Sequence, residues 1–136
     1  MGQSKNAKKS TVPPLEHRPL KLVRLKDQAV ITDQCVVAKS YFARLQGLIG
    51  RSRMEAGEGM LFPKCNDIHM WFMRIPLDVV FLRLSERGFV VSSVRENVRP
   101  WRVLPLHDFK ATETLELPAG TVARLGLQTG DELCSG

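Results

Sequence analysis

The stretch from residue 57 to residue 84 constrains the fold most, because it holds the densest apolar residues of the chain. Short apolar runs that are rich in β-branched and aromatic side chains and end at turn-forming residues are typical of β-strands. Proline has no amide hydrogen for a sheet, so Pro76 indicates a turn, bulge or sheet edge. The stretch therefore predicts several strands at the centre of the fold. The runs are Met60–Phe62, Ile68–Met73 and Val79–Leu84.

Weaker signals on either side predict further strands and two helices. A turn at Glu86–Gly88 joins two predicted strands as a hairpin. Ser40 is placed to cap a helix that ends at Gly50, and Thr121 to cap a second helix that ends at Gly126. The hydrophobic content of 43% is sufficient for one domain with its own core. We therefore expect an α+β, mostly β fold, an antiparallel barrel or sandwich with two short helices. The additional strand-like runs are 20–25, 29–32, 89–94 and 112–117.

Four polar residues interrupt the apolar part of the central stretch, namely Cys65, His69, Arg74 and Asp78. A charge or an imidazole in apolar surroundings normally needs a partner. One interpretation is structural, because a buried carboxylate such as Asp78 is usually satisfied by an ion pair or by backbone amides. The other is functional: His69, Arg74 and Asp78 line a polar pocket for a small anionic or polar ligand.

Two classes of function fit such a pocket. The leading hypothesis is a small binding or accessory module, and the alternative is a small enzyme that uses His69 and Asp78 as acid and base. The sequence contains no phosphate-binding glycine loop, no nucleophile elbow and no zinc-protease helix. Catalytic residues are therefore not assigned from the sequence.

The segment from Arg95 to Arg102 is predicted to be a loop, because Pro100 excludes a central strand. It carries several arginines around Trp101, and arginine can bind a carboxylate or phosphate through paired hydrogen bonds. Arg95, Trp101 and Arg102 are therefore further candidate ligand contacts. Trp101 is equally compatible with a place in the core. If Trp101 is exposed in an apolar patch, the Pro100–Trp101 loop predicts a protein-interaction domain instead.

Cys65 and His69 are the nearest approach to a metal pair or to a thiol activated by imidazole. In a straight strand, four residues at about 3.3 Å each separate them by about 13 Å, which is too far to share one ion. Only a turn within 64–67 would bring them together. Because the three cysteines and three histidines are scattered along the chain, we expect no stoichiometric metal and no cofactor.

Three groups of residues, in order along the chain, resemble the family catalogued as domain of unknown function 192. The first group is Arg44–Arg51. The central group is Gly57–Phe62, Cys65, Ile68–His69, Met73–Arg74, Pro76–Asp78 and Val80–Leu82. The last group is Leu115–Gly120, Arg124–Gly126 and Gly130–Asp131. The resemblance implies a compact, mostly β domain without an assigned activity.

The net charge of +6 is unevenly distributed. Residues 1–19 contain four basic residues and one acidic residue, so half of the excess lies in this segment, which is predicted to be a disordered basic tail before a domain at 20–136. Nucleic acid is therefore an unlikely partner, because it requires a clustered basic face on the domain. The N-terminal residues lack the apolar core that is typical of a signal peptide, and no apolar run approaches the length of a membrane span, so we expect neither. We expect a cytoplasmic protein with reduced thiols.

Overall fold

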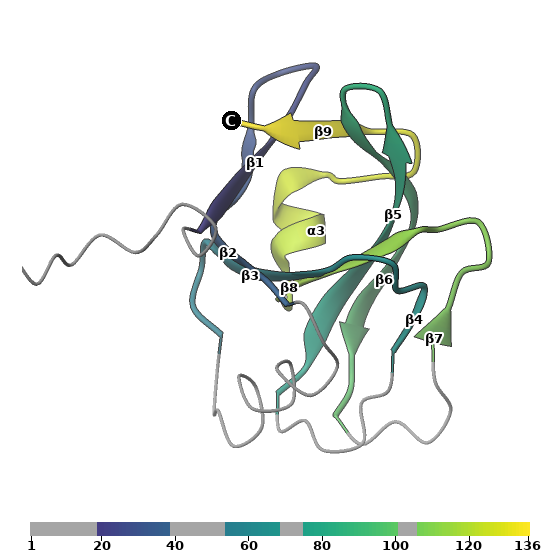
Figure 1. Ribbon diagram of the computed structural model, residues 1–136. Coiled ribbons are helices and arrows are strands. Elements are labelled where there is room, and N and C mark those ends of the chain that lie inside the picture. The colour runs from purple at the N-terminus through teal and green to yellow at the C-terminus, as the bar shows by residue number, and fades with distance from the viewer. Residues whose placement is uncertain (1–18, 39–53, 69–74, 101–105) are drawn as a thin grey trace, which may run out of the picture.

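The computed structural model describes residues 19–38, 54–68, 75–100 and 106–136 (Figure 1). Residues 1–18 of the predicted tail lie outside this part of the chain. No helix among the described residues is long and apolar enough to cross a membrane. The strands are β1 (Leu20–Arg24), β2 (Val30–Val37), β3 (Glu58–Phe62), β4 (Asp67–Ile68), β5 (Leu77–Ser85), β6 (Gly88–Val98), β7 (Leu106–His107), β8 (Glu113–Pro118) and β9 (Glu132–Ser135), and the helix is α3 (Thr121–Leu125).

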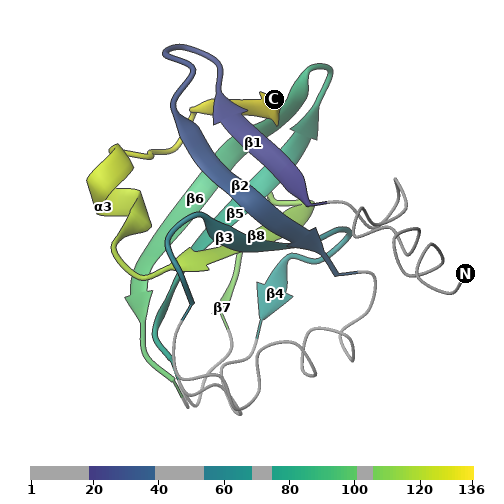
Figure 2. The ribbon, with the colours of Figure 1, turned by 90° about the vertical axis from the view of Figure 1, so that its left-hand side faces the viewer.

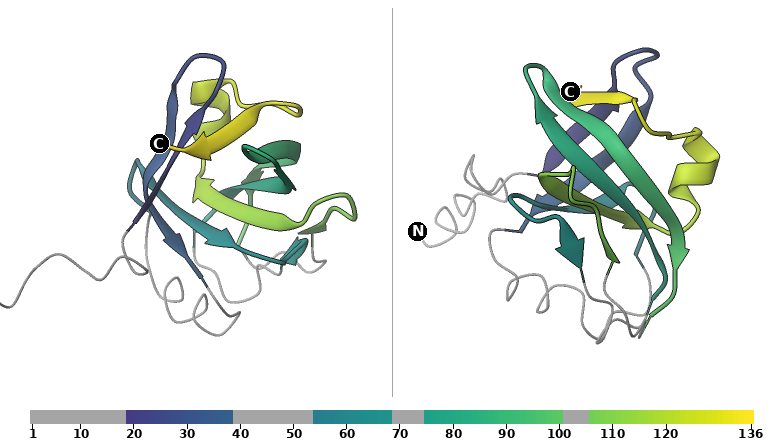
Figure 3. Two further views of the ribbon diagram at one scale, coloured as in Figure 1. Left: turned by 45° about the horizontal axis from the view of Figure 1, so that its top comes forward. Right: turned by 90° about the vertical axis from the view of Figure 1, so that its right-hand side faces the viewer.

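Seven strands form a closed barrel in the order β1-β2-β3-β8-β5-β6-β9, and β4 and β7 pair separately. The expected mostly β fold and barrel are confirmed, but the expected antiparallel arrangement is wrong for one pair, since β2 and β3 run parallel. A parallel pair needs a long crossover, and residues 38–57 provide one. The β5–β6 hairpin crosses the barrel with its turn at Glu86–Arg87 beside β9 (Figure 3).

Strand β5 is buried on both of its faces, because Leu77 to Leu82 are all buried. One set of side chains points into the barrel, and the other points outward beneath a second apolar layer. The interior cluster is Leu22, Ile31, Cys35, Leu61, Val80, Leu82, Val91, Leu115, Leu117, Val122, Leu127 and Leu133. The outer cluster is Ala38, Met60, Phe62, Ile75, Leu77, Val79, Phe81, Val98, Leu106 and Ala111.

Helix α3 lies across one open end of the barrel (Figures 1 and 2). Its Val122 and the following Leu127 belong to the interior cluster, so the helix closes the core at this end. The expected helix ending at Gly126 is confirmed, but Thr121 is its first residue and not its cap. The cap is Gly120, and the Thr121 hydroxyl donates to the Pro118 carbonyl instead. The other expected helix, at 40–50, lies outside the described residues.

The boundaries of β6 correct a second expectation. Residues 95–98 were expected in a loop, yet Arg95 pairs with Val79 and Val98 pairs with Leu77. The strand continues because the first proline, Pro100, comes only after it. Two register shifts in the β5–β6 ladder place bulges in this strand. Bulges redirect side chains and free backbone amides, and both effects matter for the site described next.

Candidate functional site

Asp78 occupies a structural position. Its side chain is fully buried, and its two carboxylate oxygens accept hydrogen bonds from the backbone amides of Asn97 and Val122, each at 2.8 Å. The amide of Asn97 is available because Asn97 lies at a register shift with a φ of 49°. Asp78 therefore joins β5 to the bulge in β6 and to the first turn of α3. Among the described residues its hydrogen-bond partners are backbone amides, as the structural interpretation expected.

Four of the predicted ligand contacts, His69, Arg74, Trp101 and Arg102, lie outside the described residues. Cys65 is described and half-buried, and its thiol donates to the Asp67 carbonyl at 3.0 Å. A turn at 63–64 precedes Cys65, with a φ of 54° at Lys64. The turn that would bring Cys65 to His69 stays untested, because His69 lies outside the described residues. Cys65 also packs against the outer cluster.

Arg95 is the third predicted site residue in the described part of the chain, after Asp78 and Cys65. The guanidinium carbon lies 5.5 Å from the centroid of the Phe81 ring, which is itself fully buried. The hydrogen bond of Arg95 is to the neighbouring Val94 carbonyl, at 3.3 Å. Among the described residues no carboxylate forms an ion pair with Arg95. Its remaining nitrogens are not buried, so they can receive a ligand.

Asp108 was not among the predicted site residues, although its carboxylate is bonded to the strand that carries Arg95 and senses the positive charge of Arg95. The hydroxyls of Ser92 and Ser93 donate to its Oδ2 at 2.8 and 2.6 Å, and the Lys110 amide donates to its Oδ1 at 2.9 Å. Adjacent residues of a regular strand point to opposite faces, but here Phe81 pairs with Ser93 and Leu82 with Val91, so Ser92 is the extra residue of a bulge. The bulge allows both hydroxyls to reach one carboxylate.

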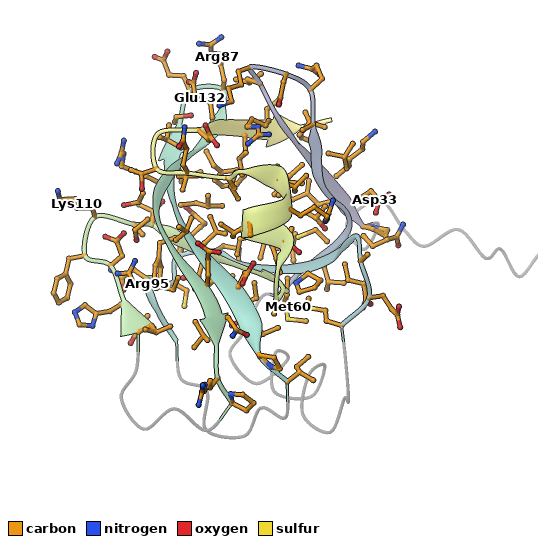
Figure 4. All side chains as sticks on the ribbon, turned by 180° about the vertical axis from the view of Figure 1, so that it is seen from behind. Asp33, Met60, Arg87, Arg95, Lys110 and Glu132 are labelled. Carbon is orange, nitrogen blue, oxygen red and sulfur yellow. The ribbon has the colours of Figure 1, made fainter. Side chains whose placement is uncertain are left out.

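The electrostatic state of Asp108 follows from these contacts. Burial by itself raises the pKa of the carboxyl, but the hydrogen bonds from Ser93, Ser92 and the Lys110 amide, together with the positive charge of Arg95, outweigh it. The pKa of Asp108 therefore lies below its usual value, and the group is charged at neutral pH. Arg95 and Lys110 lie on the same side of the molecule (Figure 4).

Strand β8 carries a buried acidic residue, Glu116, whose burial was not predicted from the sequence. The register aligns Met60, Glu116, Val79 and Arg95 in one row across β3, β8, β5 and β6. Residues paired in this way share a face of the sheet, so Glu116 and Arg95 both project on the outer face. Glu116 is fully buried. Residues 112–117 were predicted only as a strand, without an assignment of Glu116 to either face.

The described residues contain no group of three His, Cys, Asp or Glu side chains that could hold a metal ion. His107 contacts the Phe109 ring at 4.5 Å between centroids. Cys35 lies in the interior cluster, where burial raises the pKa of its thiol to about 12 and makes it a poor nucleophile. The expected absence of metal and cofactor stays a prediction.

The chain is similar to two solved structures. A protein from Sinorhizobium meliloti 1021, described as a candidate transcription regulator, is 25% identical with a TM-score of 0.68, and the match covers 90% of this chain and 98% of that one. A protein of unknown function from Novosphingobium aromaticivorans is 28% identical, also with a TM-score of 0.68, over 85% of this chain and 82% of that one. No curated protein matches the chain.

The family comparison agrees with the motifs in the sequence. The matching model is that of DUF192, described as Uncharacterized ACR, and the match extends from residue 22 to residue 134. This range includes every strand of the barrel except the first two residues of β1 and the last residue of β9. The chain therefore belongs to the DUF192 family.

Proposed function

We propose that this protein is a small-ligand binding module in which Arg95 anchors a carboxylate. The observation that supports this most is the half-buried guanidinium of Arg95, which covers the buried Phe81 ring and has no ion-pair partner among the described residues. A guanidinium presents a planar fork of donors that matches a carboxylate in two hydrogen bonds. Stacking on Phe81 restricts the side chain before any ligand arrives, which lowers the entropy lost on binding.

The charge of the Asp108 carboxylate restricts the kind of ligand that the site at Arg95 would bind. A charged carboxylate fixed beside Arg95 brings the local net charge of the pair close to zero, so the site disfavours a dianion such as phosphate. Ser92, Ser93 and the Lys110 amide occupy three of the about four acceptor positions of the Asp108 carboxylate, and the position that remains on Oδ1 favours a donor group on the ligand. The best match is therefore a small molecule with a carboxylate for Arg95 and an adjacent hydroxyl or ammonium group for Asp108.

Isothermal titration with L-lactate, acetate and inorganic phosphate tests this proposal. We expect L-lactate to bind more tightly than acetate or phosphate, and Arg95→Gln to weaken L-lactate binding by about tenfold or more, equivalent to about 1.4 kcal/mol. The matched control is Arg83→Gln, since Arg83 is an exposed arginine on the neighbouring strand β5. Equal affinities of the two variants, or no saturable binding to the parent, would contradict the proposal.

The prediction that His69 and Arg74 also contribute to ligand binding is a separate part of the proposal. In the sequence they directly follow β4 and directly precede the buried Ile75. Isothermal titration of the His69→Ala and Arg74→Gln variants with L-lactate measures this contribution. An affinity equal to that of the parent in both variants would show that neither residue contacts the ligand.

The enzyme alternative is less well supported than binding. A general base must reach the proton that it abstracts, whereas Asp78 is fully buried and both of its oxygens accept backbone hydrogen bonds. His69 would then have to act without Asp78 as its partner. For this reason we place the binding function first.

The description of the Sinorhizobium relative as a candidate transcription regulator gives a second candidate function, nucleic-acid binding. Phosphate contacts make such binding strongly salt-dependent. Fluorescence anisotropy with a labelled DNA duplex at low and at physiological salt tests it directly. Micromolar, salt-sensitive binding that survives removal of residues 1–19 would favour this function over the small-ligand proposal.

A further inference from the structure

A preformed hollow of about 390 Å³ lies on the surface between the ends of three strands. It is lined by Lys64, Asn66, Leu84, Ala111, Thr112 and Glu113. The residues come from the turn after β3, the end of β5 and the start of β8. None of them is Arg95 or Asp108, so the hollow is distinct from the proposed carboxylate site.

Hydrogen bonds hold the walls of the hollow together. The Thr112 amide donates to the Leu82 carbonyl at 2.7 Å, and the Leu84 amide donates to the Thr112 hydroxyl oxygen at 2.9 Å. On the other side, the Cys65 amide donates to the Thr112 carbonyl at 3.0 Å. The end of β5 and the turn after β3 are thus both hydrogen-bonded to Thr112 at the start of β8.

Apolar surface is unusually exposed around this hollow. Leu84 is 59% exposed, and Phe109, two residues before Ala111, is 85% exposed. They are the two most exposed large hydrophobic residues in the described part of the chain. Leu84 lines the hollow, whereas Phe109 lies in the loop that leads to it. A large exposed apolar side chain at a hollow is compatible with an interaction surface.

The charged residues at the hollow indicate the sign of the charge that a partner would carry. Glu113 is buried, and its carboxylate accepts hydrogen bonds from the Thr112 hydroxyl and the Lys64 amide, so it is satisfied within the fold. Lys64, in contrast, is exposed and forms no ion pair with the described residues. The accessible charge among the lining residues is therefore positive and complements a carboxylate.

We propose that this hollow docks a short acidic segment of a partner protein. A large apolar side chain of the segment enters the hollow against Leu84 and Ala111, and a neighbouring carboxylate pairs with Lys64. The volume admits one large side chain with its adjacent backbone and excludes a folded domain. Phe109 extends the apolar contact along the loop that joins β7 to β8. The docking site would make the protein an adaptor between its small ligand and its partner.

Panning of a phage-displayed random dodecapeptide library on the full-length protein tests the inference. We expect the enriched peptides to share one large apolar residue flanked by Asp or Glu. The corresponding synthetic peptide should bind the Leu84→Ser and Lys64→Glu variants at least about tenfold more weakly than the parent. Both positions are exposed, so neither substitution should unfold the protein.

The matched control is Val30→Ser, which removes an exposed apolar side chain from β2. Peptide affinity should be unchanged in this variant and in Arg95→Gln, which separates the docking site from the proposed ligand site. The inference is overturned if no peptide is enriched, if the enriched peptides are neutral or basic, or if they bind Leu84→Ser as tightly as the parent.

Discussion

Asp78 and Asp108 are carboxylates of the same barrel that receive different donors. Asp78 is fully buried and binds two backbone amides, whereas Asp108 lies at the surface and binds two serine hydroxyls and one amide. The difference follows from position, since Asp78 faces the barrel end closed by α3 and Asp108 follows β7. The first residue contributes to the fold, and the second is available to a ligand.

Replacement of Asp78 tests its structural role. Asp78→Ala leaves the amides of Asn97 and Val122 buried without an acceptor, so we expect a loss of about 2 to 4 kcal/mol in the free energy of unfolding. Urea unfolding followed by circular dichroism measures this change. The control is Asp33→Ala, an exposed aspartate on β2 that should change stability by less than about 0.5 kcal/mol. An unchanged midpoint for Asp78→Ala would show that the two amides find other acceptors.

At the scale of the element, the β5–β6 hairpin links the proposed carboxylate site to the proposed docking hollow. At its first bulge, the Ser92 hydroxyl donates to Asp108, and at its second bulge the Asn97 amide donates to Asp78. Near the end of β5, Leu84 lines the hollow. The tight turn of the hairpin packs directly on β9, and Gly88 lies at the contact with a φ of 148°. The hairpin is therefore held at its turn as well as along its length.

A Cβ atom on Gly88 would collide with the Leu133 carbonyl oxygen. Gly88→Ala should therefore lower the free energy of unfolding through both backbone strain and this collision. We expect the collision to add about 1 to 3 kcal/mol to the loss that backbone strain alone causes. Gly120→Ala is the matched control, because Gly120 has a φ of 95° but no atom within 4 Å of the added Cβ. We expect the control to lose about 1 to 2 kcal/mol from the left-handed conformation. Equal losses in thermal or urea unfolding would mean that β9 moves away from the turn without cost.

Local signals in the sequence predicted where strands, turns and helices form better than they predicted which strands pair and which side chains meet. The turn at Glu86–Gly88 and the helix ending at Gly126 carry their own residue signatures. The parallel pairing of β2 with β3 has no local signature, because it depends on the path of a long crossover. The position of Asp108 against β6 likewise depends on one extra residue, Ser92, whose bulge cannot be recognised without the β5 register.

At the scale of the whole molecule, the barrel closes where β1 meets β9 near the end of the chain. A buried guanidinium, Arg24, strengthens this closure. It donates to both oxygens of Asp27 at 3.0 Å, to Asp131 at 3.3 Å and to the Gly126 carbonyl at 3.2 Å. These contacts connect the turn after β1 to the loop between α3 and β9, so they join the two ends of the barrel sheet.

This network predicts acid sensitivity. The hydrogen bond from Arg24 holds the pKa of Asp27 below its usual value. A carboxyl whose pKa is lowered on folding contributes stability above its unfolded pKa, near 4, and the contribution is lost as pH falls through the lower folded pKa. The stability difference between the parent and Asp27→Asn should therefore shrink as pH falls from about 5 to about 2. Urea unfolding across this range measures it, with Asp33→Asn as control, and a difference that does not depend on pH would contradict the account.

The carboxylate site beside Arg95 is the central claim, and nuclear magnetic resonance with a ¹⁵N-labelled protein tests it most directly. On titration with L-lactate, we predict saturable shifts of the Arg95 Nε resonance and of the Lys110 amide, which donates to Asp108. The Arg83 Nε resonance should stay unchanged, because Arg83 is an exposed arginine on β5 outside the site. Equal shifts of the two arginines, or saturable shifts that leave Arg95 and Lys110 unaffected, would contradict the proposed site.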